Sequence, residues 1–319
     1  MTDLRSKSFS FRAISGIWIF LILSGIGIIS GAFSVFGAET ADVVDYRTFF
    51  GFDPRTTVWI IAELHLMFGA FVLGVPMFAV TVEYVGVLTK EERYDRLAKD
   101  FTRLLSASFA LTAALGGLLT FALFTLYPKV MTFMSGIFHE SFYIYAFFFF
   151  GETFVLYFYY YSWDRLKKRK GIHITAGVLL NIIGLIIMGI SNSWATYMMS
   201  PSGIDPETMK FTGTLMDAIW NPLWNPLNLH RILGNAVFGG YVAGAYAAVK
   251  FLTAQTDEDR AHYDWMGYVG NFIAIVSLLF LPFAGYYLGR EVYSFSPIMG
   301  NNMMGGAFSW TFIIQAIGI

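Results

Sequence analysis

Residues 171–204, GIHITAGVLLNIIGLIIMGISNSWATYMMSPSGI, contain no Asp, Glu, Lys or Arg. A helix that crosses the hydrocarbon core of a bilayer needs about 20 predominantly apolar residues, so this stretch is long enough to span a membrane. The rest of the chain has the same character. Of its 319 residues, 56% are hydrophobic, 18% aromatic and only 13% charged, whereas a soluble domain is about a quarter charged. We therefore expect an all-α, polytopic transmembrane helix bundle.

Other stretches with few or no charges predict the remaining spans. They lie between Arg12 and Glu39, Arg103 and Lys129, Arg231 and Lys250, Asp264 and Arg290, and at about 57–86 and 141–163, where isolated acids occur. The tail after Glu291 is uncharged, but its final apolar part is short for a full crossing. The sequence thus predicts seven to eight spans in one membrane domain (1–319). Its parts are an N-terminal helix (1–38), a helix bundle (57–289), and an outer loop with a short final helix (290–319).

Lys and Arg residues are concentrated in alternate loops. Most of the 21 lie before residue 13 or at 90–103, 165–170 and 250–260. Positive charge marks the cytoplasmic side of a membrane protein, so we expect a cytoplasmic N-terminus. The net charge of −1 argues against a nucleic-acid binder. The lack of cysteine excludes disulfides, iron–sulfur ligation and covalently attached c-type haem.

Ionisable side chains at membrane depth need a functional reason, because burying them costs several kcal/mol. His65 lies roughly 12 Å into the second span. His139 is predicted to open the fourth span and His230 the sixth, and all three lie toward the outer side. Imidazole is the usual axial ligand of b-type haem, so we expect His65 and His230 as axial ligands and His139 as a third candidate. The alternative for each is an interfacial histidine bonded to backbone. His173 and His262 lie in or beside cytoplasmic loops and are expected to be solvated.

Two of the acidic residues within the predicted spans are candidates for a functional role. Glu83 follows His65 by 18 residues, so both face one side of the helix while lying roughly 27 Å apart along it. Glu83 therefore lies near the cytoplasmic end, where it either admits protons or pairs with a basic loop residue, the second being favoured. Glu152 lies in mid-span with no charge nearby in sequence. We expect it to relay protons or to contact a haem edge.

From the second helix to about the seventh, the sequence resembles subunit I of cytochrome bd quinol oxidases. The similarity rests on four pieces in order: His65, Pro76 and Glu83; 152–155 with 163–166; 192–194 with Pro201; and Asn221-Pro222, His230 and 240–245. The resemblance implies haem b, with a chlorin-type haem d as a further cofactor. It matches His65 to the ligand of a high-spin haem and His230 to the ligand of a low-spin haem. It also implies a bacterial or archaeal cytoplasmic membrane.

The sequence departs from the family pattern in several places. The family's low-spin ligand lies about one turn closer to Tyr241 than His230 does, at the position of Asn235. A second family glutamate corresponds to Ile144, and Glu140, one turn further out, substitutes for it only after rearrangement. The long outer quinol-binding loop has no counterpart, and the terminal helices are missing or truncated. A final set of residues has candidate roles at the haems: Met299 as a thioether ligand or a packing residue, and Arg231 and Arg290 as partners of haem propionates.

Three functions remain open. The favoured one is a haem-b subunit that carries electrons between quinone or quinol and a periplasmic c-type cytochrome or a larger respiratory complex. The second is a quinol oxidase subunit that reduces oxygen at a high-spin haem, with protons entering past Glu83 and Glu152. The third is a cofactor-free scaffold or a proton-coupled transporter. The first two require other membrane subunits as partners.

Overall fold

The structure is a computed structural model that describes residues 48–49, 51–306 and 309–318. These ranges are helical apart from their connections and two isolated bridges, Phe49–Phe52 and Ile204–Phe211. The chain divides into two compact units, one of residues 47–295 and a second that includes residues 296–319. Each unit is described by itself. The N-terminal helix predicted at 1–38 lies outside the described residues.

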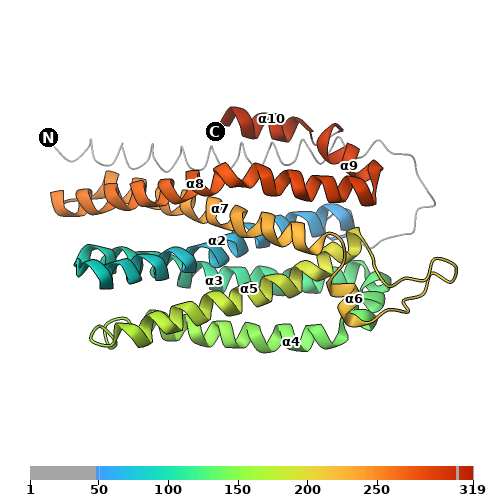
Figure 1. Cartoon of the computed structure of the whole chain (residues 1–319), viewed down its shortest axis with the longest axis horizontal. Helices are drawn as coiled ribbons and strands as arrows, with labels where there is room; N and C mark the ends of the chain where they lie inside the picture. The colour runs from blue at the N-terminus through green and yellow to red at the C-terminus, as the bar shows by residue number, and fades with distance from the viewer. Residues whose placement is uncertain (1–47, 50, 307–308, 319) are drawn as a thin grey trace. The chain divides into compact units, whose positions relative to one another are not determined.

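Six long helices make up the first unit (Figure 1). They are α2 (Pro54–Thr89), α3 (Glu92–Leu126), α4 (Pro128–Tyr161), α5 (Lys170–Met199), α7 (Trp224–Thr253) and α8 (Asp257–Phe295). All six are long and apolar enough to cross a membrane, judged by length and composition. The short helix α6 (Leu215–Ile219) lies in the connection between α5 and α7, and Thr214 caps its first turn. The predicted all-α, multi-span fold class is thereby confirmed.

The helices extend beyond the spans that the sequence predicts. Helix α3 begins at Glu92, well before the charge-free stretch that follows Arg103, and α8 continues to Phe295, past Arg290. A charge-free stretch marks the part of a helix that suits the hydrocarbon core. It does not mark the helix ends, because charged turns remain helical where water can solvate them.

The connection between α3 and α4 shows the largest difference from the prediction. Tyr127 alone separates the two helices, and Pro128 opens α4. Proline suits the first turn of a helix because its missing N–H would have no intrahelical partner there. His139 therefore lies about three turns inside α4, and the prediction that it opens this span is wrong.

Glycines bring helix backbones close together. A Cβ added at Gly74 of α2 would lie 2.2 Å from the backbone oxygen of Asn235 in α7. A Cβ added at Gly240 of α7 would lie 2.6 Å from the carbonyl oxygen of Gly270 in α8. Small residues at such contacts let helices pack closely in lipid, where van der Waals packing drives association.

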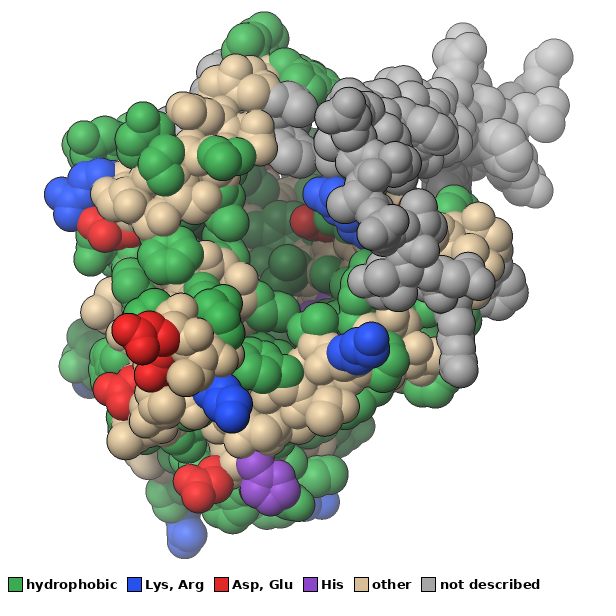
Figure 2. All heavy atoms as spheres, turned by 90° about the vertical axis from the view of Figure 1, so that its right-hand side faces the viewer, with side chains coloured by type: hydrophobic (Ala, Val, Ile, Leu, Met, Phe, Trp, Pro, Cys, Tyr) green, Lys and Arg blue, Asp and Glu red, His purple; other side chains and the backbone are tan. Residues whose placement is uncertain are grey.

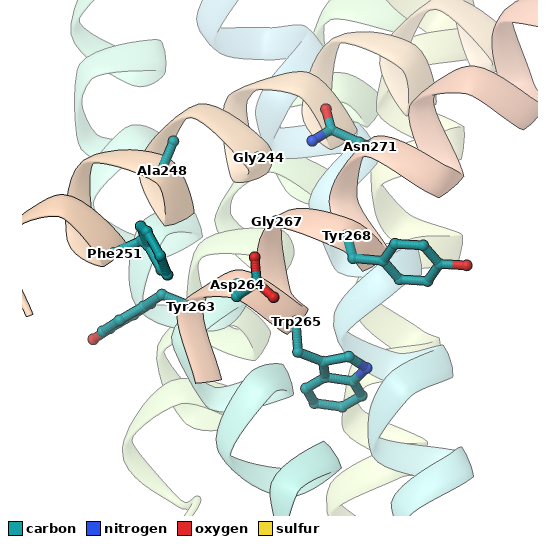
Figure 3. A pocket seen from close by; sticks show the side chains of 9 residues that line it. All are labelled: Gly244, Ala248, Phe251, Tyr263, Asp264, Trp265, Gly267, Tyr268 and Asn271. Carbon is teal, nitrogen blue, oxygen red and sulfur yellow. The ribbon is translucent and has the colours of Figure 1, made fainter. Parts of the chain in front are cut away.

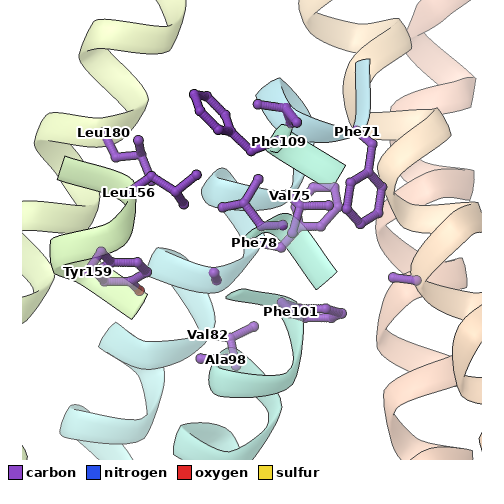
Figure 4. Packing of buried hydrophobic residues seen from close by; sticks show 14 of the residues in the cluster. Phe71, Val75, Phe78, Val82, Ala98, Phe101, Phe109, Leu156, Tyr159 and Leu180 are labelled. Carbon is purple, nitrogen blue, oxygen red and sulfur yellow. The ribbon is translucent and has the colours of Figure 1, made fainter. Parts of the chain in front are cut away.

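A buried apolar core joins α2, α3, α4 and α5 (Figure 4). Phe78 of α2 and Phe101 of α3 meet edge to face, with ring centroids 6.2 Å apart. Leu156 of α4 and Leu180 of α5 belong to the same cluster. This core fixes the relative positions of the four helices. The positions of the polar side chains on these helices, above and below the core, follow from it.

The second unit contains two short helices, α9 (Pro297–Met304) and α10 (Ser309–Gly318). Helix α9 falls in the segment that the sequence predicts as outer loop. Helix α10 has 10 residues, or roughly 15 Å, which is about half the thickness of a bilayer core.

Candidate functional site

His65 lies half-buried on α2, beside α3. Its Nδ1 is 3.0 Å from the backbone oxygen of Thr112. A carbonyl oxygen can only accept, so Nδ1 carries the hydrogen of the neutral ring and Nε2 keeps a lone pair. Gly116, one turn along α3, leaves room for the imidazole, since a Cβ there would lie 2.9 Å from Cε1 of His65. Metal-bound histidines usually donate from one ring nitrogen in this way and coordinate with the other.

His230 lies half-buried in the second turn of α7. It faces Gly285 of α8, where an added Cβ would lie 3.8 Å from Nε2 of His230. The guanidinium of the next residue, Arg231, lies within electrostatic range of both His230 and His65. The fold thus brings two predicted ligands and one predicted propionate partner to a common region.

Arg231 is held in place by an amide network between α5 and α7. Its Nη1 donates to Oδ1 of Asn192 at 2.5 Å. Nδ2 of Asn192 donates to Oδ1 of Asn228 at 2.8 Å, and Nδ2 of Asn228 donates to the backbone oxygen of Trp224 at 2.8 Å. A guanidinium fixed in this way is suited to bind carboxylates, including those of a haem.

The residues of this region fit a haem better than a bare metal ion. Among the described residues, no three His, Cys, Asp or Glu side chains converge as a metal-ion site. A haem needs only axial ligands from the protein, and His65 offers a ring nitrogen that is already oriented by Thr112. Asn235, the position at which the resemblance places a ligand, is instead buried in helix packing, with its Nδ2 3.5 Å from Sδ of Met188.

Four other predicted site residues are not part of these contacts. His139 and Glu140 are exposed on α4, and the ring of His139 lies 5.1 Å from that of Tyr143. Arg290 is exposed and donates from Nε to its neighbour Glu291 at 3.0 Å. Met299 belongs to α9, in the second unit. Their predicted roles remain predictions.

Glu152 is buried in the C-terminal half of α4, with 6% of its surface exposed. It borders a cavity of about 10 Å³ together with Pro76 of α2 and Asn181 of α5. Oδ1 of Asn181 is buried and has no hydrogen-bond partner among the described residues. Tyr145, about two turns before Glu152 on α4, lies within electrostatic range of both Glu152 and Arg231. Glu152 therefore lies between the core of the bundle and the region of the two histidines.

Glu83 lies at the opposite end of the bundle, which we call the basic end and which is formed by the connections at 90–91, 162–169 and 254–256. Its carboxylate accepts from Nζ of Lys170 at 2.9 Å and from the hydroxyl of Tyr159 at 2.8 Å. The sequence favoured a pairing of Glu83 with a basic loop residue, and Lys170, the first residue of α5, is that residue.

The two histidines of the basic end are buried, so the prediction that they are solvated is wrong. Nδ1 of His173 lies 2.7 Å from Oε1 of Glu83, and no part of either side chain is exposed. Nε2 of His262 lies 2.9 Å from Oδ2 of Asp100. Each histidine is close to a charged loop in sequence, but another helix supplies its buried partner. Tyr159 and Lys170 also contact a buried partner on another helix, and no pattern in the sequence indicated these two residues.

A larger cavity lies between α7 and α8 (Figure 3). Its volume is about 550 Å³, and none of the predicted site residues lines it. Four of its nine lining residues are aromatic, Phe251, Tyr263, Trp265 and Tyr268, and they lie beside Asp264 and Asn271.

At the end of the molecule that carries the α5–α7 connection, charged side chains are scattered among hydrophobic ones (Figure 2).

Comparison with known proteins gives three similarities. The family model described as "Cytochrome bd terminal oxidase subunit I" matches residues 54–306. A protein of Bacillus subtilis (strain 168) named "Putative cytochrome bd menaquinol oxidase subunit I" is 24% identical over 218 residues, which cover 68% of this chain and 47% of that protein. The solved bd oxidase from Geobacillus thermodenitrificans matches with a TM-score of 0.67 and 20% identity, covering 78% of this chain and 58% of the other. The chain thus spans about half the length of the curated relative that it matches.

Proposed function

Because this chain belongs to the cytochrome bd terminal oxidase subunit I family, we propose that it is the haem-bearing membrane subunit of a quinol oxidase-type respiratory complex. In this role it carries electrons from a quinol through haem b to the rest of the complex. Its partners are other membrane subunits and quinol. The named relatives are bacterial, which supports a bacterial inner membrane and gives no support to an archaeal one. They also give no support to a c-type cytochrome as partner.

The contact between His65 and Thr112 carries this proposal. It directs Nδ1 of His65 to a backbone oxygen at 3.0 Å and leaves Nε2 as a ligand atom. His65 and His230 would bind haem iron, and Arg231, fixed by Asn192, would offset the charge of the propionates. The haem supplies one-electron transfer when bound. Glu152, buried between this region and the basic end, would hold a proton.

Optical spectroscopy of the purified complex tests the proposal. Reduced-minus-oxidised spectra are recorded for the wild type, for His65→Ala and for His230→Ala. Each substitution should remove one haem signal, because each removes an axial ligand. His139→Ala tests the third candidate ligand, and because this histidine is exposed on α4, an unchanged spectrum would remove it from the site. Full haem retention in both ligand variants would refute the site.

Carbon monoxide separates the two redox functions. It binds reduced haem iron that has a free coordination position. If it perturbs a band that disappears in His65→Ala, then oxygen reduction at that haem is supported. If carbon monoxide changes no band that depends on this chain, the chain serves electron transfer alone. A spectrum with no haem assignable to this chain would favour the scaffold or transporter.

A further inference from the structure

We infer that Glu83 and His173 form a buried proton-binding site that exchanges protons with water at the basic end through Lys170 and Asp95. The geometry of these residues carries the inference. It rests on the proposed function only for the use of the proton, which a quinol oxidase-type complex would consume.

The hydrogen bonds of His173 determine how many protons the site holds. Nδ1 faces the carboxylate of Glu83 at 2.7 and 2.9 Å, and Nε2 faces the backbone oxygen of Tyr159 at 2.8 Å. A carbonyl oxygen only accepts, so Nε2 must carry a hydrogen. If Nδ1 were bare, its lone pair would then point at the oxygens of an ionised carboxylate. One further proton is therefore needed, either on Nδ1 or on Glu83.

The charges around the site compensate for that proton. Lys170 lies between two carboxylates, donating to Glu83 at 2.9 Å and also contacting Asp95. Asp95 also accepts from Nε1 of Trp163 at 3.2 Å. The positive charges of Lys170 and of the shared proton balance the negative charges of the two carboxylates, so the cluster is neutral. Loss of the proton would leave one negative charge in a region shielded from water, which is costly.

The neighbours of His173 exclude water from the proton. Its ring is stacked on that of Tyr159, with centroids 4.3 Å apart, and lies 4.5 Å from the ring of Trp163. The titratable groups that face the site come from four helices. They are Glu83 on α2, Asp95 on α3, Tyr159 on α4 and Lys170 on α5.

A cavity at the basic end connects this site to water. Its volume is about 580 Å³, and Asp95 and Trp163 form part of its wall. The side chain of Asp95 is 26% exposed and that of Lys170 is 17% exposed, whereas Glu83 and His173 are fully buried. A proton taken from water by Asp95 can pass to Lys170 as Lys170 releases one to Glu83. The number of protons on Lys170 is unchanged by this exchange.

The site also lies on a line toward Glu152. Tyr159 and Glu152 are about two turns apart on α4, or roughly 10 Å. The cavity of about 10 Å³ beside Glu152 is bordered by three of those four helices, α2, α4 and α5. A space of that size holds about one water molecule. The seam between these helices therefore places two buried carboxyl groups in succession between the basic end and the predicted haem ligands.

The protonation state can be measured without using activity. The purified complex is labelled with ¹⁵N-histidine for NMR and examined by infrared spectroscopy at pH 8. The wild type minus His173→Gln difference should show a doubly protonated ring, or the wild type minus Glu83→Gln difference should show a protonated carboxyl band. Either result supports the site. A neutral His173 beside an ionised Glu83 would overturn it.

Proton uptake during turnover tests the use of the site. Glu83→Gln and Asp95→Asn should each slow quinol oxidation about tenfold or more at pH 8, with haem spectra unchanged. The matched control is Asp100→Asn, which removes a histidine–carboxylate contact at the same end but between α3 and α8. It should keep the wild-type rate and pH profile. Wild-type rates in both test variants would show that the cluster is only structural, whereas a wild-type complex with neither haem signals nor quinol oxidation would count against the proposed function.

Discussion

The two ends of the bundle treat their histidines in opposite ways. At the basic end, both ring nitrogens of His173 face acceptors, and the side chain is fully buried. At the other end, Nδ1 is the only ring nitrogen of His65 that faces an acceptor among the described residues, and both His65 and His230 are half-buried. The fold completes the hydrogen bonds of one site and leaves a ligand atom available at the other. A buried site whose polar groups are all hydrogen-bonded within the protein suits the storage of a proton. A site in which a histidine nitrogen keeps a lone pair suits the binding of a cofactor.

The largest effect is expected from breaking the completed end. Glu83→Ala removes the only carboxylate that contacts both Lys170 and His173 among the described residues. Breaking a buried pair by removing one partner costs about 3–5 kcal/mol, because the remaining charge is left uncompensated. The free energy of unfolding, measured by denaturant titration of the purified chain, should fall by that amount. A loss below 1 kcal/mol would show that the pair contributes little to the fold.

An intermediate effect is expected at the incomplete end. Gly116→Ala places a Cβ 2.9 Å from Cε1 of His65 and forces the ring to turn away from Thr112. Disturbing the group that orients a metal-bound histidine typically lowers metal affinity about 10- to 100-fold. Haem titration of the purified variant should show that loss, while its helix content stays unchanged. Gly117→Ala is the control, because a Cβ there meets no atom within 4 Å.

The smallest effect on stability is expected from an exposed ion pair, which serves as a reference for the buried sites at the two ends of the bundle. Lys99 donates to Asp164 at 2.9 Å, and this hydrogen bond holds the pKa of Asp164 below its ordinary value of 3.8. A lowered pKa means that any stabilisation is present above the ordinary value and is lost as pH falls through the lowered one. Asp164→Asn should therefore melt within error of the wild type at pH 7. If the two melting curves differ at pH 7, they should converge in acid.

The sequence predicts the helices of this bundle well because hydrophobic length is a local property. Each of the six described spans was found from a stretch with few or no charges. Helix ends were placed less well, and His139 shows why. The charge of Lys129 predicts the end of one span, with the next beginning near Ser141, yet Pro128 begins a helix directly after Tyr127. A single charge near a membrane surface does not stop a helix.

The candidate site could be predicted only in part because partners come from other helices. His65 and His230 are predicted from their place toward the outer side, from the use of imidazole as a haem ligand and from the family resemblance, and the structure places Arg231 within electrostatic range of both. His173 was missed because it follows five basic residues in sequence. One local signal was present. His173, Ala176, Gly177 and Leu180 share one helix face, and all four are buried. A polar residue that continues such an apolar face is expected to point inward.

The contact between Gly240 and Gly270 has a mechanical consequence. The two backbones approach so closely that a Cβ at Gly240 would lie 2.6 Å from the carbonyl oxygen of Gly270, so a side chain at either position would force α7 and α8 apart. His230 of α7 lies roughly 15 Å from this contact on one side, and His262 of α8 lies roughly 12 Å from it on the other. The spacing of the helix pair that carries both histidines is therefore set by two residues that have no side chain.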